Sequence, residues 1–242
     1  MYYYVLESPS SRAVRQTYQK LRDTLTNLGI AGEMVTASPA RTPTELTQMG
    51  ISKGYSTIVA VGADDHIDEV AIASLGKAVL GIVPVNASRL VTGLIGTSDI
   101  RGSAESLKKR RLTTHSVVVI EPDSAFFLDA HILPPKIAKV SLVIDNKVRV
   151  HSYFNTLRID RGLNIFIESA HVSEPKKIFG LFKRASETLT SQSTFHAKQV
   201  RIVTEPALAL IVGNAKVAQT PLELRLLPES LKLITKRGTV LE

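Results

Sequence analysis

Residues 56–70 read STIVAVGADDHIDEV, in which an apolar run ends at Gly62 and is followed by a cluster of acidic side chains. A continuous apolar run without alternation is typical of a strand that is buried on both faces of a parallel sheet. The spacing that begins at Ile67 predicts a helix over about residues 67–75 and therefore a β-α unit. Ligands of such sheets bind beyond the carboxyl ends of the strands, so the residues after Gly62 are the first candidates for a site.

The sequence on both sides of this stretch repeats the alternation of strand and helix. Residues 2–6 form a short β-rich run, and residues 12–29 carry apolar side chains at helical spacing. Residues 79–83 form a second apolar run, and residues 88–94 have a helical pattern. Repeated β-α units with buried strands predict a parallel sheet that is covered by helices.

After residue 114 the pattern changes to short β-rich runs that are separated by turn residues, and only residues 176–190 have a helical pattern. Strands that are punctuated by turns predict an antiparallel sandwich. We therefore expect an α/β domain with a parallel sheet and helices at residues 1–114. An all-β, sandwich-like domain is expected at residues 115–242, with its last strand free to return to the first domain.

The composition excludes several kinds of site. The 242 residues include no cysteine, which excludes disulfides, thiolate zinc sites and a cysteine nucleophile. No apolar run approaches the roughly 18–20 residues that a spanning helix needs, and the start does not read as a secretory signal, so we expect a cytoplasmic protein. The formal net charge of +8 favours nucleotides, nucleic acid or acidic lipid headgroups as partners, without choosing among them.

Several segments, in one collinear order, resemble motifs of the NAD kinase–diacylglycerol kinase superfamily. Residues 58–70 are similar to its strand, Gly-Gly-Asp-Gly-Thr motif and following helix, and residues 80–85, LGIVPV, to its Leu-Gly-Ile-Ile-Pro-Leu strand. Residues 160–167 resemble its Asp-Gly-Leu-Leu-Asp-Val strand. Residues 219–233 resemble its closing segment, Glu-Thr-Pro … Leu-Pro … Ala-Leu-Lys-Val, which favours the lipid-kinase branch.

This resemblance implies an α/β nucleotide-binding domain followed by a β sandwich. It also implies transfer of the γ-phosphoryl group of ATP to a lipid hydroxyl with Mg²⁺, a reaction that depends mainly on positioning and on neutralising charge. The candidate nucleotide-binding residues are those that stand at the positions of the nucleotide motifs, namely Gly62, Ala63, Asp64, Asp65, His66, Glu69, Ser88 and Arg89, of which Gly62, Asp64 and Glu69 match the family residue. By the same resemblance, Asp64 and Asp65 are candidate metal ligands and Asp160 is a candidate catalytic residue.

The chain departs from the family pattern in each nucleotide motif. Asp65 stands at the position of the third glycine, and two like charges about 4 Å apart repel by ~4 kcal/mol at an effective dielectric near 20. Residues 86–90 read NASRL in place of Gly-Thr-Gly-Asn-Asp, although Ser88 and Arg89 could bind an anion at a helix N-terminus. These changes predict a divergent or catalytically weakened lipid kinase. The alternative is a non-catalytic pseudokinase that binds a nucleotide or an acidic lipid and acts through partners.

Each of three charged segments can be interpreted either as a binding site or as an ordinary structural feature. The acidic residues 64–69 form either a divergent magnesium or nucleotide site or a polar cap on the following helix. Residues 108–111, KKRR, either attract phosphates or form a solvated helix end. Residues 176–184, KKIFGLFKR, either rest on an anionic membrane surface, which would make the protein peripheral, or pack on the sandwich.

A nucleotide is the expected partner. A nucleic acid is not expected, because no aromatic and basic motif accompanies the positive charge. A homodimer is left open, since antiparallel edge strands can pair between chains.

Overall fold

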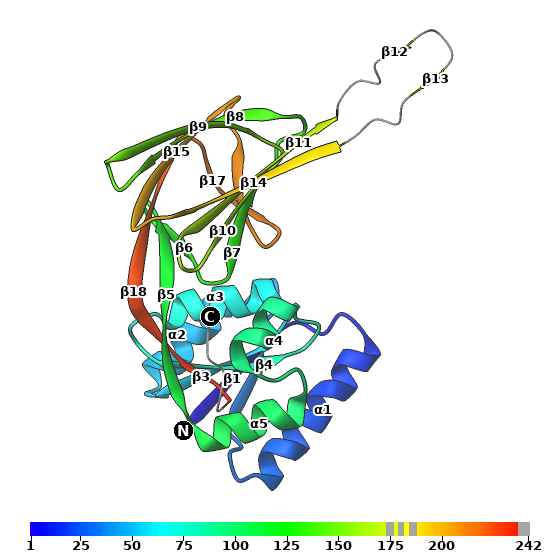
Figure 1. The fold of residues 1–242 in the computed structure, drawn as a ribbon. Coiled ribbons are helices and arrows are strands. Elements are labelled where there is room, and N and C mark those ends of the chain that lie inside the picture. The colour runs from blue at the N-terminus through cyan, green and yellow to red at the C-terminus, as the bar shows by residue number, and fades with distance from the viewer. Residues whose placement is uncertain (173–176, 179–181, 184–187, 237–242) are drawn as a thin grey trace. The chain divides into compact units, whose positions relative to one another are not determined.

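The computed structural model describes residues 1–172, 177–178, 182–183 and 188–236 (Figure 1). The chain divides into two compact units. The α/β unit contains Met1–Val117, Ala125–Leu128 and the described residues from Leu227 onward. The β unit contains Val118–Ser124 and Asp129–Leu226. Strand β18 (Leu222–Ile234) therefore begins in the β unit and ends in the α/β unit.

The α/β unit is built on a parallel sheet with the strand order β2-β1-β3-β4-β18. The first four strands of this unit are β1 (Tyr2–Leu6), β2 (Glu33–Thr36), β3 (Thr57–Gly62) and β4 (Val79–Pro84). Every residue of β3 is buried, as its uninterrupted apolar run predicts. Leu233 of β18 pairs with Leu80 of β4. β18 is therefore the fifth strand of the parallel sheet that β1 to β4 form.

Helices cover this sheet on two faces, because successive residues of a strand point to opposite sides. They are α1 (Arg12–Asn27), α2 (Pro43–Ser52), α3 (Asp64–Ser74), α4 (Arg89–Ile95) and α5 (Ile100–Lys109). Tyr3 and Ile58 belong to one core with residues of α2, α3 and α4. Tyr4 and Val59 belong to the other core with residues of α1 and α5, which lie side by side in Figure 1.

The β unit is antiparallel. One run of paired strands has the order β18-β15-β8-β9, and a second sheet has the order β14-β11-β10-β7-β16-β17. The further strands are β5 (Leu112–Ile120), β6 (Ser124–Phe126), β7 (Asp129–Ile132), β8 (Ala138–Ile144), β9 (Val148–Phe154), β10 (Thr156–Asp160), β11 (Asn164–Val172), β12 (Lys177–Ile178), β13 (Phe182–Lys183), β14 (Thr188–His196), β15 (Gln199–Glu205), β16 (Ala209–Val212) and β17 (Ala215–Gln219). The α/β part with a parallel sheet and the antiparallel β part confirm the predicted fold class.

The prediction of a helix at residues 176–190 is wrong for the described residues of this range, 177–178, 182–183 and 188–190, which are strands. β12 and β13 pair with each other, and β14 begins at Thr188. β14 pairs with β11 continuously from Asn164↔His196 to Val172↔Thr188. At residues 188–190, where the predicted helix overlaps β14, this long ladder overrides the local helical pattern. The remaining residues of 176–190 lie outside the described part of the chain. Among the described residues, no helix is long and apolar enough to cross a membrane.

Candidate functional site

Helix α3 begins immediately after β3. Asp64, Asp65 and His66 therefore lie in its first turn, and the predicted start at Ile67 is three residues late. The N-cap residue, Ala63, has no side chain that could accept a hydrogen bond. Glu7, which follows β1, supplies the acceptor, and the Ala63 N–H donates to its Oε2 at 2.8 Å. Carboxylates at this end of the helix are favourable for the helix dipole, which explains the early start.

Gly62 is packed beneath the Glu7 side chain. A Cβ at this position would lie 2.7 Å from Cβ and Oε2 of Glu7 and 3.1 Å from Cδ2 of His66. Atoms this close cannot coexist, so a larger residue would displace Glu7 from the Ala63 N–H. The resemblance assigns Gly62 to the close approach of a nucleotide. In this chain the glycine also makes room for a carboxylate that caps α3.

His66 is buried and fixed to the neighbouring strand. Its Nε2 lies 2.8 Å from the carbonyl oxygen of Val5, which can only accept, so Nε2 carries the proton. Burial lowers the pKa of His66, and the Val5 carbonyl and the charge of Glu7 offset part of that effect. The neutral ring has a single N–H, and Val5 receives it. His66 therefore serves as an anchor between α3 and β1.

The two loops that the sequence assigned to nucleotide binding meet at a hydrogen bond. The Ser88 N–H donates to Oδ1 of Asp64 at 2.7 Å, which joins the start of α3 to the start of α4. Ser88 Oγ in turn accepts the Leu90 N–H and caps α4. Arg89 is the first residue of that helix and is exposed.

Asn86, at the position of the first glycine of the second motif, adopts a backbone conformation that glycine favours. Its φ is +59°, in the left-handed region. Asparagine tolerates this conformation better than most residues with a side chain. The loss of the first glycine of the second motif is therefore compatible with the same kind of backbone turn.

The remaining acidic residues of α3 differ in their surroundings. Asp68 is buried, and its Oδ1 accepts the N–H groups of Phe127 and Leu128 at 2.8 and 2.7 Å. These bonds fix the Ala125–Leu128 segment to α3 within the α/β unit. Glu69 is exposed, and partial desolvation together with the charge of Asp65 raises its pKa.

Asp160 belongs to the β unit and ends β10. Its Oδ1 accepts the N–H groups of Gly162 and Asn164, both at 2.9 Å, and its Oδ2 accepts from Nδ2 of Asn164 at 2.9 Å. Both carboxylate oxygens therefore hold the turn between β10 and β11. The structure thus brings residues 62–69 together with Ser88 and Arg89 in one unit and places Asp160 in the other.

The donor set at the carboxyl edge of the α/β sheet can contribute to a metal site but cannot form one alone. Within residues 1–172, 177–178, 182–183 and 188–236, no three His, Asp or Glu side chains lie close enough together to hold a metal ion. Mg²⁺ commonly needs only one or two carboxylates when phosphates supply further oxygens. Asp64 and Asp65 are the carboxylates in the first turn of α3 that could do so, and Asp64 already uses Oδ1 for Ser88.

Sequence reasoning missed Glu7. A signal existed, because parallel neighbours end at the same edge of a sheet, and Leu6 pairs with Val61. The residue after β1 therefore lies opposite the residue after Val61. What no local pattern contains is the choice of acceptor for the Ala63 N–H, which is 56 positions away in the chain.

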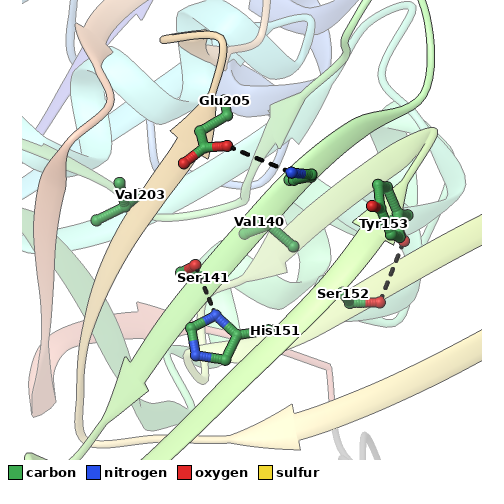
Figure 2. Close-up of a pocket in the computed structure, with 8 residues that line it drawn as sticks. Val140, Ser141, His151, Ser152, Tyr153, Val203 and Glu205 are labelled. Atoms are coloured by element: carbon green, nitrogen blue, oxygen red, sulfur yellow. Dashed lines mark hydrogen bonds and ion pairs between the residues drawn. The ribbon is translucent and has the colours of Figure 1, made fainter.

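A separate groove of about 400 Å³ lies on one face of the β unit, over β8, β9 and β15. Figure 2 shows Ser141 beside His151, with Oγ and Nδ1 2.8 Å apart, and an ion pair of 3.8 Å between Lys139 and Glu205. The one carboxylate among the residues that line the groove, Glu205, is paired with Lys139 and does not orient His151 as a base for Ser141. None of the sequence-predicted site residues lines this groove.

Neither a protein-family model nor a curated protein matches the sequence. Solved structures do match over almost the whole chain. A Bacillus anthracis protein assigned as a diacylglycerol kinase has a TM-score of 0.74 and 14% identity and covers 98% of both chains. An Archaeoglobus fulgidus NAD kinase in complex with ATP has a TM-score of 0.58 and 14% identity, with 99% of this chain and 95% of that chain covered. Yeast NADH kinase complexed with NADH has a TM-score of 0.54 and 9% identity, with 98% and 83% covered.

The shared feature of these structures is the fold, since the identities are low. Each match covers both units of this chain. The chain therefore has the two-domain fold of the NAD kinase–diacylglycerol kinase superfamily, as its motifs predicted.

Proposed function

We propose that this protein is a lipid-kinase-like protein that binds a nucleotide at the carboxyl edge of the α/β sheet, with weakened phosphoryl transfer. The order of its motifs and the fold that it shares with diacylglycerol kinases support this function. The ATP and NADH complexes of its two NAD-kinase-type neighbours support a nucleotide as the ligand.

The observation that carries the proposal is the hydrogen bond of 2.7 Å between the Ser88 N–H and Asp64. It holds the two nucleotide loops together, which favours a preformed site. The same bond occupies a backbone donor that a phosphate oxygen would otherwise use and places a carboxylate beside it. A nucleotide therefore binds only if a cation neutralises the Asp64 carboxylate or if Asp64 moves away from the phosphates. Phosphoryl transfer depends on positioning and on neutralised charge, so this requirement supports a weakened rate of transfer.

A non-catalytic role is the second candidate, and Asp160 favours it. Three hydrogen bonds to the β10–β11 turn use most of the acceptor sites of this carboxylate, so proton abstraction by Asp160 would weaken the bonds that hold the turn. In this alternative the protein binds a nucleotide or an acidic lipid and acts through a partner.

The first test is calorimetric titration with ATP, with and without Mg²⁺. We expect Mg²⁺-dependent binding by the wild type. Asp64→Asn keeps an oxygen that can accept the Ser88 N–H but removes the charge, so loss of binding assigns Asp64 to the metal, whereas tighter binding assigns it to repulsion of phosphates. Asp99→Asn is the matched control, because Asp99 likewise caps a helix by accepting a backbone N–H. No binding by any variant at millimolar ATP contradicts the proposal.

The second test separates the two candidates. Transfer of labelled phosphate from ATP to diacylglycerol in mixed micelles is measured for the wild type and for Asp160→Asn. Slow transfer by the wild type supports the weakened kinase. ATP binding without transfer to diacylglycerol or to other lipid hydroxyls supports the non-catalytic alternative.

A further inference from the structure

A second depression in the α/β unit lies at the amino-terminal edge of the same sheet. Its volume is about 240 Å³, and its lining includes Ser56, Lys77, Arg110, Ser230 and Lys232. Ser56 directly precedes β3, and Lys77 lies two residues before β4. Ser230 and Lys232 come just before the point where β18 pairs with β4. β3 and β4 therefore begin at this depression, and β18 passes it before it pairs with β4.

The depression is separate from the nucleotide motifs. Those motifs follow the carboxyl ends of β3 and β4, at Gly62 and Pro84. Strand β3 extends from Thr57 to Gly62, and at ~3.3 Å per residue the two edges of the sheet are roughly 20 Å apart. A ligand at one edge therefore makes no contact with the other.

The charged side chains that line the depression are all positive. Lys77 comes from the turn between α3 and β4, Arg110 from the end of α5, and Lys232 from β18. Among the described residues, no ion pair involves any of these three cations. A concave site lined by one sign of charge concentrates the field and attracts an anion. Arg110 belongs to the basic run 108–111, for which the sequence left the role open.

The backbone of Arg110 is unusual in a way that fits a ligand site. It is the C-cap of α5, with φ +49° and ψ +46°. Glycine or asparagine is the favoured residue in this left-handed conformation. Residues held in such sparsely populated conformations cluster at ligand sites. Here the residue in this conformation is an arginine that lines the depression.

The size of the depression limits the ligand to a compact group. Pockets that enclose drug-sized molecules have volumes of roughly 300–1,000 Å³, and this one is smaller. A phosphate monoester is mostly a dianion at neutral pH, because its second pKa is about 6. The planar fork of an arginine and the point charges of lysines are the usual partners of such an anion. Ser56 and Ser230 also line the depression, and the Ser230 hydroxyl donates to the carbonyl oxygen of Leu227 at 3.0 Å. We propose that this pocket binds the phosphate group of a monoester or diphosphate ligand, independently of the proposed nucleotide site.

The test is calorimetric titration with pyrophosphate at neutral pH and low ionic strength. We expect Lys77→Ala and Lys232→Ala each to lower the affinity about tenfold, the effect of losing one charge-assisted contact. Lys108→Ala and Lys109→Ala are matched controls, because these exposed lysines belong to the same basic run but do not line the pocket. No binding by the wild type at millimolar pyrophosphate, or an equal loss in all four variants, overturns the proposal.

Two further variants test whether the measured pyrophosphate binding occurs at this pocket. Arg110→Gly is expected to weaken binding without lowering thermal stability, because glycine suits the left-handed backbone. Arg89→Ala removes the exposed cation beside the proposed nucleotide site, so its effect measures how much pyrophosphate binds at the other edge of the sheet. Loss of binding in Arg89→Ala together with unchanged binding in Lys77→Ala and Lys232→Ala moves the anion to the other edge and overturns the proposal.

The source of the phosphate is distinguished by sedimentation with vesicles. One set contains phosphatidylcholine alone and the other adds phosphatidic acid, whose headgroup is a phosphate monoester. Binding to the second set that Lys77→Ala and Lys232→Ala reduce identifies a lipid headgroup as the ligand. Binding of pyrophosphate without binding of either vesicle identifies a soluble phosphate compound. Both results support the proposal that this pocket binds a phosphate group.

Discussion

The two edges of the α/β sheet use charge in opposite ways. At the carboxyl edge, the carboxylates of Glu7, Asp64 and Asp68 each accept backbone N–H groups of the chain. At the amino-terminal edge, Lys77 and Lys232 lie around a pocket together with Arg110, and no described residue forms an ion pair with them. The edge that carries the family motifs thus uses three of its carboxylates to hold the fold. The edge without a motif has its cations available.

The difference shows where binding energy is available to a ligand. A hydrogen bond to an ionised group contributes roughly 1.5–3 kcal/mol, and a ligand that displaces Asp64 from Ser88 must first break such a bond. A phosphate at the amino-terminal edge breaks no ion pair of the described residues. The motifs at the carboxyl edge therefore identify the fold more securely than they identify the ligand that binds there.

The largest expected effect tests whether the carboxylates of α3 serve the fold. Asp68→Ala leaves the buried N–H groups of Phe127 and Leu128 without their acceptor, so we expect the free energy of unfolding to fall by about 3 kcal/mol. Urea denaturation measures this change. Asp68→Asn keeps an oxygen acceptor and is expected to lose much less. If the alanine variant is as stable as the wild type, the Asp68 carboxylate does not stabilise the fold.

A smaller effect is expected at Gly62. Gly62→Ala places a methyl group 2.7 Å from Glu7, which must then leave the Ala63 N–H, and overpacking of this kind typically costs about 2 kcal/mol. Gly93→Ala in α4 is the matched control. Its Cβ would have no atom within 4 Å, and alanine favours a helix over glycine by about 1 kcal/mol. Thermal melts of the two variants should move in opposite directions, and a loss of stability in both would mean that the contact with Glu7 is not the cause.

The sequence predicted those parts of the fold that depend on local patterns. The apolar runs predicted the positions of β3 and β4. The pattern failed where a distant partner decides the structure. β14 forms because it pairs along its whole length with β11, and α3 starts early because Glu7 caps it.

The candidate site was predictable to a similar extent. The parallel pairing of β3 and β4, which the sequence predicted, brings the loops after both strands to one edge. That a ligand binds at this edge stays a prediction. The sequence could not show which carboxylates the chain would use for its own N–H groups. Asp68 finds its partners at residues 127 and 128, and Asp160 finds them in its own turn. The same limit applies to the amino-terminal pocket, whose cations come from three distant segments.

His66 provides a test of the carboxyl edge through pH. Its pKa is lowered below 6.5 by burial, so in the window just below pH 6.5 the unfolded chain holds a proton that the folded chain does not. Stability is therefore retained above that value and falls as the pH decreases, by up to about 1.4 kcal/mol per pH unit. His66→Gln keeps an N–H donor for Val5 but does not titrate, so its denaturation midpoint should change less between neutral and mildly acidic pH. Parallel curves for both proteins would show that His66 protonates as freely when folded.

The smallest expected effect lies at the amino-terminal edge and is opposite in sign. Arg110→Gly removes the cost of a left-handed backbone at a residue with a side chain, and we expect the free energy of unfolding to rise by about 1 kcal/mol. Asn86→Gly at the carboxyl edge is the matched control, because asparagine already tolerates its φ of +59° and little gain is expected. Urea denaturation of both variants measures the difference. If Arg110→Gly gains no stability, contacts of the guanidinium already offset its strain, and the amino-terminal edge uses its charge for the fold just as the carboxyl edge does.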